Sequence, residues 1–212
     1  VKNYGVQAIG VTLSEQQAIW GQDAIKEAGL EGSAQIRFCD YRDVTETDFD
    51  AISSIGLTEH IGRAHYPAYF SFLNDKLKPE GRMLNHTITR PDDTEPTHYR
   101  KSFINRYVFP DGELSAPGVI MNAFNDSGFE IRHGENLREH YALTLKHWCQ
   151  NLEDHWEEAV TEVGLGTARV WRLYMAASRM GFEMNTIQLH QMLGVKLGPR
   201  GKSGMPLRAV FS

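Results

Sequence analysis

The chain has 212 residues and a mass of 24.0 kDa, which is enough for one large domain. Hydrophobic residues make up 41% and charged residues 23% of the sequence, a globular composition that excludes disordered and fibrous classes. A formal net charge of -5 argues against a nucleic-acid partner, and no apolar run reaches the ~20 residues of a membrane span. With no secretory-signal pattern and two cysteines, Cys39 and Cys149, the sequence predicts a reduced, cytoplasmic protein.

Predicted strands and helices alternate in the first part of the sequence. Ser14 to Gln17 has the form of a capping box, with Gln17 reaching back, so a helix is expected to begin there and to end at Gly29. A second helix is expected over 65–77. The residues expected on its buried side are Tyr69, Phe72 and Leu73. The predicted strands cover residues 6–11, 34–39, 49–55 and 83–89. This alternation indicates βαβ units and a parallel sheet.

The pattern changes after residue 90. Residues 90–96 are polar and expected to form a loop, and residues 186–195 are ambiguous, although a strand there would close the sheet. Helices are predicted over 117–127, 138–163 and 168–183, with a strand over 129–133. Residues 198–212 are rich in Gly, Pro and basic side chains and are expected to lie on the surface or fray. We therefore expect a doubly wound α/β sheet with a helical insertion over its carboxyl edge, where such folds bind ligands.

Six segments together resemble one family. They are Gly10-Val-Thr-Leu-Ser14, Cys39-Asp-Tyr-Arg-Asp43, Ser54-Ile-Gly-Leu-Thr-Glu-His-Ile-Gly62, Asn85-His-Thr-Ile88, Phe103-Ile-Asn-Arg-Tyr-Val-Phe-Pro-Asp-Gly112 and His140-Tyr-Ala-Leu-Thr-Leu145. Their order and spacing resemble the cyclopropane-fatty-acyl-phospholipid synthases and mycolic-acid methyltransferases, which use S-adenosylmethionine. The resemblance implies a Rossmann-like class I methyltransferase sheet, truncated at its N-terminus. Residues 1–195 would be a partial methyltransferase domain with a lipid-binding helical insertion over about 90–185, and 196–212 a surface tail.

The resemblance also implies elements that this sequence does not contain. Family members carry a glycine-rich loop after the first strand and, further upstream, a short Cys-containing segment at the reaction centre. Such a loop holds the methionine part of the cofactor through backbone amides. We therefore expect a fragment that is inactive on its own. If the natural chain begins at Val1 instead, a binding module that has lost the chemistry is the alternative.

The residues that the resemblance assigns to S-adenosylmethionine lie at predicted strand ends. They are Thr12, Leu13, Gln17, Asp40, Tyr41, Ile55 and Gly56. The Asp40 carboxylate can accept the adenine amino hydrogens, although a strand-terminal Asp also forms Asx-turns. Gln17 also fits a purely structural role in the capping box. The small Gly56 permits close approach of the backbone to a ligand.

The resemblance assigns the reaction centre to Glu59, His86 and Tyr141, which with the main chain of Ile88 would hold a bicarbonate ion as the base. Each side chain also suits a structural role: Glu59 as the cap of the helix that begins near His65, His86 as a core histidine, and Tyr141 as a packing residue against its helix neighbours. An anion beside a carboxylate is reasonable if Glu59 shares a proton with it and the other two side chains donate.

The implied reaction adds a carbon to a double bond. The π electrons of an alkene attack the sulfonium methyl, and a base must then remove a proton from the cationic acyl chain, giving a cyclopropane or a methylene branch. Aromatic residues could line the acyl site and stabilise the cation. They are Phe70, Tyr107, Phe109, Trp148, Trp171 and Tyr174. Many cyclopropane-forming relatives have an aromatic residue directly before the Glu-His pair, where this sequence has Leu57-Thr58. The Asn85-His86 pair and the stretch 171–179 also resemble the actinobacterial tuberculostearic-acid branch, which is linked to methylene-branched chains. A small-molecule methyltransferase is the remaining alternative.

No metal site is expected, because His140, His147 and His155 lack the spacing of a zinc helix. Basic residues gather at the C-terminal end: Lys196, Arg200, Lys202 and Arg208. They suit docking on anionic lipid as well as simple solvation. The expected partners are unsaturated phospholipid acyl chains at the inner face of the membrane. A second copy of the chain, forming a homodimer, is a further candidate partner.

Overall fold

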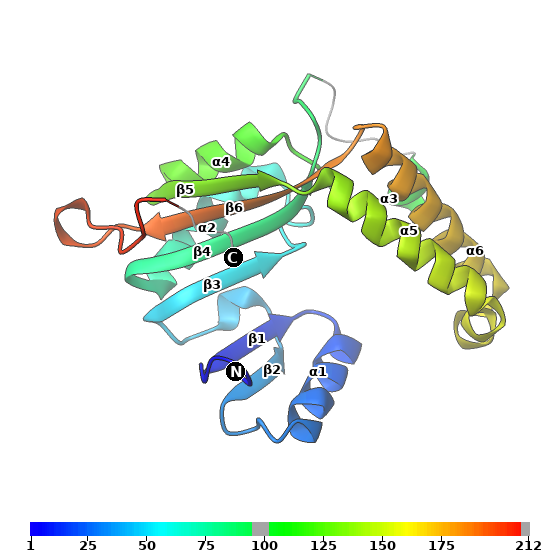
Figure 1. Ribbon diagram of the computed structural model, residues 1–212, viewed down its shortest axis with the longest axis horizontal. Coiled ribbons are helices and arrows are strands. Elements are labelled where there is room, and N and C mark those ends of the chain that lie inside the picture. Colours follow the sequence, from blue (N-terminus) through cyan, green and yellow to red (C-terminus); the bar gives the residue numbers. More distant parts are fainter. Residues whose placement is uncertain (95–101, 209–212) are drawn as a thin grey trace. The chain divides into compact units, whose positions relative to one another are not determined.

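The computed structural model describes residues 1–94 and 102–208, and the chain divides into two compact units, Val1–Glu46 and Thr47–Ser212 (Figure 1). Residues 95 and 96 of the expected loop, and 209–212 of the expected tail, lie outside the described residues.

The first unit is a βαβ arrangement, as predicted. Strands β1 (Ala8–Thr12) and β2 (Ala34–Phe38) pair in parallel, and α1 (Glu15–Glu27) connects them. The Ser14 hydroxyl caps α1 by accepting from the Gln17 amide, but Gln17 does not reach back: its side-chain oxygen accepts from the Thr12 hydroxyl at 2.9 Å. The Ser14 amide instead donates to Thr12 Oγ1, so the expected capping box is only half formed. A short turn, η1 (Tyr41–Asp43), follows β2.

The second unit contains a four-stranded sheet in the order β3-β4-β6-β5. Its strands are β3 (Phe49–Ile55), β4 (Leu77–Thr89), β5 (Phe129–Asn136) and β6 (Gln188–Lys196). β3 and β4 are parallel, as expected, but β6 is antiparallel to both β4 and β5. The physical reason is the pair of helices between β5 and β6. The first helix leads away from the end of the sheet where β5 finishes, and the second leads back to that same end, so β6 runs in the opposite direction to β5.

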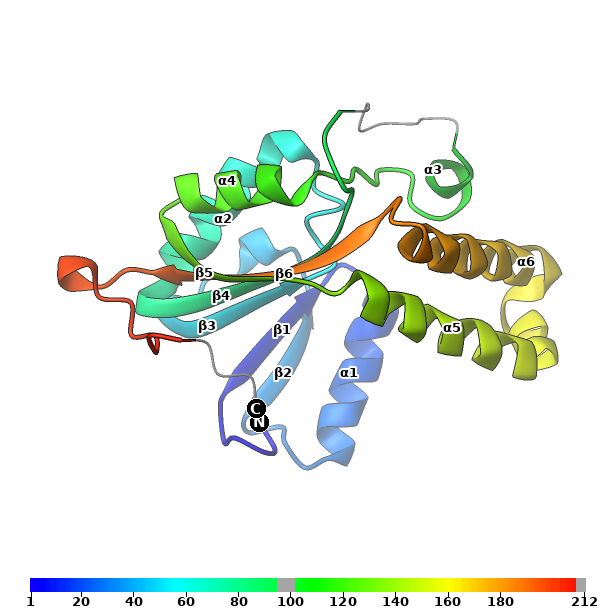
Figure 2. The same ribbon diagram turned by 45° about the horizontal axis from the view of Figure 1, so that its top comes forward.

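Helices cover one face and one end of this sheet. The helical elements of this unit are η2 (Arg63–His65), α2 (Tyr66–Lys76), α3 (Phe103–Tyr107), α4 (Pro117–Asp126), α5 (Arg138–Asp154), α6 (Trp156–Glu183) and, in the tail beyond β6, η3 (Pro199–Gly201). Figure 2 shows α2 and α4 side by side over one face, whereas α5 and α6 project from the end where β3 and β4 finish. No helix in the described parts of the chain is long and apolar enough to cross a membrane.

The core of the second unit lies under α2 and α4. Phe70 is fully buried and stacks on Phe124 at 4.9 Å between ring centroids, and Phe124 in turn meets Phe129 at 4.5 Å. Tyr69 and Leu73 are buried as predicted, but Phe72 is only half-buried, and Phe70 takes the core position. Phe70 therefore packs the protein interior and is not available to line an acyl site.

Alternate residues of β4 face opposite sides of the sheet. One set is fully or nearly fully buried on the side of α2 and α4: Met83, Asn85, Thr87 and Thr89. The other set, Leu84, His86 and Ile88, is half-buried on the opposite side. His86 is thus on the face away from the aromatic core.

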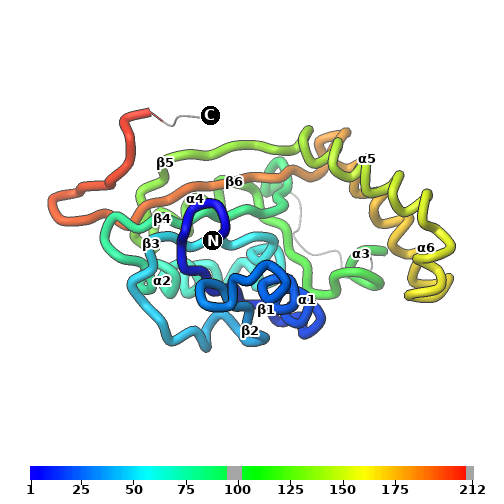
Figure 3. The backbone as a smooth tube through the Cα atoms, turned by 60° about the horizontal axis from the view of Figure 1, so that its bottom comes forward, coloured from blue at the N-terminus to red at the C-terminus, as the bar shows by residue number. Residues whose placement is uncertain are grey.

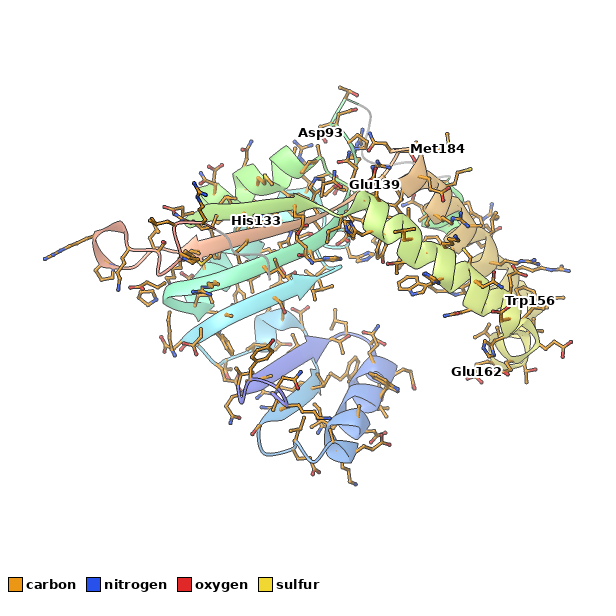
Figure 4. All side chains as sticks on the ribbon, viewed as in Figure 1. Asp93, His133, Glu139, Trp156, Glu162 and Met184 are labelled. Atoms are coloured by element: carbon orange, nitrogen blue, oxygen red, sulfur yellow. The ribbon has the colours of Figure 1, made fainter. Side chains whose placement is uncertain are left out.

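The paired helices α5 and α6 contain one break that was not predicted and one that falls between the two predicted helices. α5 ends at Asp154, where His155 leaves helical geometry, and Gly164 interrupts α6 with φ +80°. The expected helix over 138–163 is therefore divided at His155, whereas Gly164 lies between the two predicted helices and has a φ that glycine adopts without strain. Figure 4 shows Trp156 and Glu162 at the end of these helices far from the sheet, and Glu139 and Met184 at the near end.

The tail beyond β6 lies at the opposite end of the sheet from α5 and α6 (Figure 3). It folds over the start of β4, where Lys202 approaches Glu80 at 3.4 Å and Arg82 donates to the carbonyl of Gly204 at 3.3 Å. Glu80 itself has a φ of +67°. The described part of the tail is therefore held on the surface by specific contacts.

Candidate active site

The carboxylate of Glu59 is buried at the carboxyl end of the sheet, with 6% of the residue exposed. Its Oε1 accepts a hydrogen bond of 2.6 Å from the main-chain amide of Ile88, and its Oε2 is buried with no hydrogen-bond partner in the described chain. Glu59 does not cap the helix near His65. The first amide of that turn, at Arg63, donates instead to Glu113 Oε2 at 2.8 Å. An unpaired buried carboxylate oxygen is costly, so packing alone does not account for this arrangement.

The loop that carries Glu59 is fixed at both ends. Gly56 follows β3 with φ +64°, a conformation that favours glycine, and its amide donates to the carbonyl of His86 at 2.9 Å. The carbonyl of Glu59 accepts from the amide of Glu113 at 2.8 Å. Ile55, the last residue of β3, is 68% exposed at this edge. The carboxylate position is therefore set by the backbone on two sides.

His86 is bonded through only one of its ring nitrogens. Its Nδ1 lies 3.1 Å from the side-chain Nε2 of Gln191 on β6, and Nε2 of the ring has no partner in the described residues. Burial lowers the pKa of His86, and the nearby charge of Glu59 partly offsets this effect. The imidazole is therefore neutral at neutral pH, with one N–H to donate.

A second histidine shows what a purely structural histidine looks like in this sheet. His190 is 8% exposed on the face covered by α2 and α4, where its Nδ1 lies 2.8 Å from Thr89 Oγ1. His86 is more open and lies on the opposite face. The simple core interpretation fits His190 better than His86.

Two tyrosines complete the surroundings of Glu59. Tyr141 on α5 and Tyr174 on α6 are half-buried, and burial raises the pKa of each, with a smaller contribution from the charge of Glu59. Tyr141 also packs in the apolar cluster that includes Ile88 and Leu189. Its ring meets Phe182 at 5.0 Å, so the packing role is present whatever else the hydroxyl does. Both phenols remain protonated at neutral pH and can donate hydrogen bonds.

Aromatic rings surround this end of the sheet. Tyr174 makes edge contacts with Phe109 at 5.7 Å and with Trp171 at 5.5 Å between centroids, and Phe109 also meets His60 at 5.0 Å. Trp148 contacts Tyr141 at 5.8 Å. Tyr107 is 55% exposed on α3. Of the six aromatic residues considered from the sequence, Phe109, Trp148, Trp171 and Tyr174 are connected to the surroundings of Glu59 through these contacts.

In the first unit, the predicted cofactor residues gather at the carboxyl ends of β1 and β2. Asp40 accepts from Arg42 through both carboxylate oxygens and through the Arg42 amide, and these bonds hold the pKa of Asp40 at about 2. This is the Asx-turn foreseen as the alternative, but Oδ2 accepts only one bond and keeps a free lone pair. Burial raises the pKa of Tyr41, whose ring lies 5.9 Å from the Arg42 guanidinium. Leu13 is 70% exposed.

Two residues of the second unit were not identified from the sequence. Gln191 pairs with His86, and Glu113 anchors the loop of Glu59. Gln191 could have been found only from strand register, and Glu113 carries no local signal. Among residues 1–94 and 102–208, no three His, Cys, Asp or Glu side chains form a group that could hold a metal ion.

Comparison with known proteins identifies the family. A probable fatty acid methyltransferase of Mycobacterium tuberculosis is 56% identical over 204 residues, covering 96% of this chain and 48% of that protein. A tuberculostearic acid methyltransferase of the same organism is 30% identical, covering 92% and 46% respectively. The chain thus spans about half the length of these curated relatives.

Solved structures agree with this assignment. The mycolic acid cyclopropane synthase CmaA1, in complex with SAH and CTAB, superposes with a TM-score of 0.84 at 27% identity, covering 92% of this chain and 72% of that one. The fold is therefore that of an α/β class I methyltransferase, as the sequence led us to expect. The sequence profile of the family described as mycolic acid cyclopropane synthetase matches residues 1–192. The chain belongs to this family.

Proposed function

We propose that the full-length protein is an S-adenosylmethionine-dependent methyltransferase that adds a one-carbon unit to the double bond of an unsaturated fatty acyl chain in a phospholipid. The observation that carries this proposal is the buried Glu59 carboxylate, with one oxygen fixed by the Ile88 amide and the other unpartnered. Family membership supports the reaction class. The apolar, aromatic surroundings support a lipid acceptor over a polar small molecule.

The residues around Glu59 are suited to hold a small oxyanion, which we propose to be bicarbonate. His86 has an N–H with no partner in the described residues, and the Tyr141 phenol is protonated, so both can donate to the anion. Glu59 would share a proton with it through Oε2. The Ile88 amide is already donated to Glu59, so its part is to orient the carboxylate. An anion held this way can take the proton that a cationic acyl chain must lose, without water as a competing nucleophile.

The residues that we propose to bind the cofactor belong to both units. In the first unit, Asp40 is ionised above about pH 2 and keeps a lone pair for the adenine amino group. The other residues proposed there are Thr12, Leu13, Gln17 and Tyr41. In the second unit they are Ile55 and Gly56. When bound, S-adenosylmethionine would supply a methyl group on a positively charged sulfur. The chain's own residues position the cofactor and the acyl chain and take up the released proton.

The product, assembly and location are finer parts of the proposal. We favour a methylene-branched product over a cyclopropane, since Leu57-Thr58 precedes the Glu-His pair and a tuberculostearic acid methyltransferase is among the relatives. We further propose that the protein acts at the inner face of the membrane, that it forms a homodimer, and that residues 1–212 alone are inactive. Sedimentation tests the dimer, and assaying residues 1–212 beside the full-length protein tests the inactivity.

Mass spectrometry of lipids provides the direct test. The full-length protein and its Glu59→Gln variant are expressed in a host with unsaturated phospholipids, and acyl chains that gain one carbon and two hydrogens are sought. We expect such acyl chains only in cells that express the wild-type protein. Both candidate products have that mass, so fragmentation must locate a surviving double bond: its presence supports the methylene product, and its absence supports the ring. No mass gain with a folded protein and adequate cofactor would overturn the proposal.

A further inference from the structure

Gln191 and His86 face each other directly across two antiparallel strands. In the register of β4 and β6, His86 is opposite Gln191, and the neighbouring pairs on the same face are Leu84 with Leu193 and Ile88 with Leu189. The side-chain Nε2 of Gln191 lies 3.1 Å from Nδ1 of His86. The two residues therefore meet by the geometry of the sheet and without rearrangement of a loop.

The chemistry of an amide decides the direction of this hydrogen bond. An amide nitrogen can only donate, so Nδ1 of His86 must be the acceptor, and the proton of the neutral ring must be on Nε2. Burial keeps the ring neutral by lowering the pKa of His86. The nitrogen left free by Gln191 is thus the one that carries the hydrogen.

We propose that Gln191 is a positioning residue that fixes His86 in the Nε2–H tautomer and so presents a hydrogen-bond donor to the anion site beside Glu59. The role of Gln191 in catalysis rests on the proposed function, whereas its effect on the tautomer of His86 does not. Partners that orient a functional histidine commonly act in this way, through the ring nitrogen that does not face the ligand. Loss of Gln191 would leave Nδ1 without a donor and allow both tautomers and other ring orientations.

Nearby charged and titratable groups do not replace Gln191. Glu59 is the one whose charge acts on the pKa of His86, and it opposes the effect of burial. Tyr141 and Tyr174 lie on the helices that pack at this end of the sheet, and Glu135 of β5 is opposite Gln191 in the register. These groups are present in the wild type and in the variants of Gln191, so a difference in the tautomer of His86 between these proteins reports on Gln191.

The test is nitrogen-15 NMR of the histidine rings in the full-length protein, with Gln191→Leu and Gln191→Glu as variants. In the wild type, His86 should show a protonated Nε2 and an unprotonated Nδ1. Gln191→Leu should give a mixed tautomer. Gln191→Glu, which can accept from Nδ1–H, should favour the doubly protonated ring and move its titration to higher pH. Gln188→Leu is the matched control, because Gln188 is on the same strand, faces the other side and bonds to Asn185.

The methylation assay adds a second readout. Gln191→Leu should lower turnover roughly 10- to 100-fold, the range found when a partner that orients a metal-bound histidine is removed, and Gln188→Leu should not. A wild-type His86 with its proton on Nδ1, or a tautomer unchanged in Gln191→Leu, would overturn the inference. If the tautomer shifts as expected in a protein that methylates no lipid, the proposed function fails and the assignment of Gln191 stands.

Discussion

Replacing Glu59 by Gln should separate stability from activity. The side chain is 6% exposed, and Oε1 accepts from the Ile88 amide at 2.6 Å while Oε2 is unpartnered. Gln keeps the same shape and an acceptor for Ile88, but it removes the burial of a group that can ionise. A buried polar group without a partner costs about 1–3 kcal/mol, and a charged one costs more. We therefore expect the free energy of unfolding of Glu59→Gln to equal or exceed that of the wild type, by up to about 2 kcal/mol.

Glu59→Leu should behave differently. It also removes the carboxylate, but it leaves the Ile88 amide buried without an acceptor, so it should be less stable than Glu59→Gln by about 1–3 kcal/mol. For a domain of this size, 1 kcal/mol corresponds to roughly 2–4 °C in Tm. Thermal unfolding of the three proteins measures this order. Both variants should lose lipid methylation by about 100-fold or more, the contribution of a positioned proton acceptor.

A distant variant provides the control. Tyr69 on α2 donates a buried hydrogen bond of 2.6 Å to the Ser54 hydroxyl on the opposite face of the sheet. Tyr69→Phe should lower the free energy of unfolding by about 1 kcal/mol and leave methylation unchanged. The reasoning would be refuted by a Glu59→Gln protein that is clearly less stable than the wild type and active in proportion to its folded fraction, because Glu59 would then be a structural residue.

Two further predictions concern the ends of the strands. Gly56→Ala should lower the free energy of unfolding in urea by about 1–2 kcal/mol, because Gly56 has φ +64°, and this strain is the only cause, since no atom would crowd a Cβ there. Gly118→Ala, which is also uncrowded but lies inside α4, should not lower it. The Asp40 carboxyl, followed by NMR, should titrate near pH 2, and nearer pH 4 in Arg42→Ala. Because its pKa is lowered on folding, the stability it contributes is present above about pH 4 and lost as pH falls toward 2. A wild-type midpoint near 4 would contradict this.

Local signals in the sequence were sufficient for most of the first unit and for β3. Ser14 and Gly29 mark the beginning and end of α1 through capping and a left-handed backbone, both of which depend on one or two residues. The strand predicted from residue 83 is shorter than β4, which begins at Leu77. Pro79 and Gly81 disfavour a strand locally. β3 pairs with Leu77 and then again from Arg82 onward, whereas β6 pairs only from Arg82 onward, and no local pattern contains that information.

The candidate site was predictable where a side chain is unusual by itself. A Glu-His pair after a buried strand and a histidine inside an apolar strand drew attention to Glu59 and His86. Gln191 could not be identified in the same way. Its role depends on β6 running antiparallel to β4, which in turn depends on α6 returning to the edge that α5 left. A direction reversal set by two helices 28 and 17 residues long is a property of the whole second unit.

The position of the basic tail bears on how the protein would meet a membrane if it acts on phospholipids as proposed. Its described basic residues lie at the end of the sheet opposite Glu59: Arg82, which holds the tail through Gly204, is six residues from Ile88 along β4, or roughly 20 Å. A phospholipid head group bound at the tail would therefore need an acyl chain that runs along the sheet over this distance to bring its double bond to Glu59. The helix α3 is better placed, because Phe109 just after it contacts both His60 and Tyr174.

Neutralising charges at the two ends should consequently have different effects. Arg200→Gln combined with Arg208→Gln should leave methylation of acyl chains in anionic vesicles unchanged. Arg106→Gln, on the exposed side of α3 next to Tyr107, should raise the lipid concentration needed for half-maximal rate, by up to about fivefold for the loss of about 1 kcal/mol of attraction to the surface. Raising the salt concentration should reduce this difference, because the attraction is screened. If the tail variant is impaired and Arg106→Gln is not, the acyl chain must reach Glu59 from the opposite end, and the aromatic side chains around Tyr174 do not line its path.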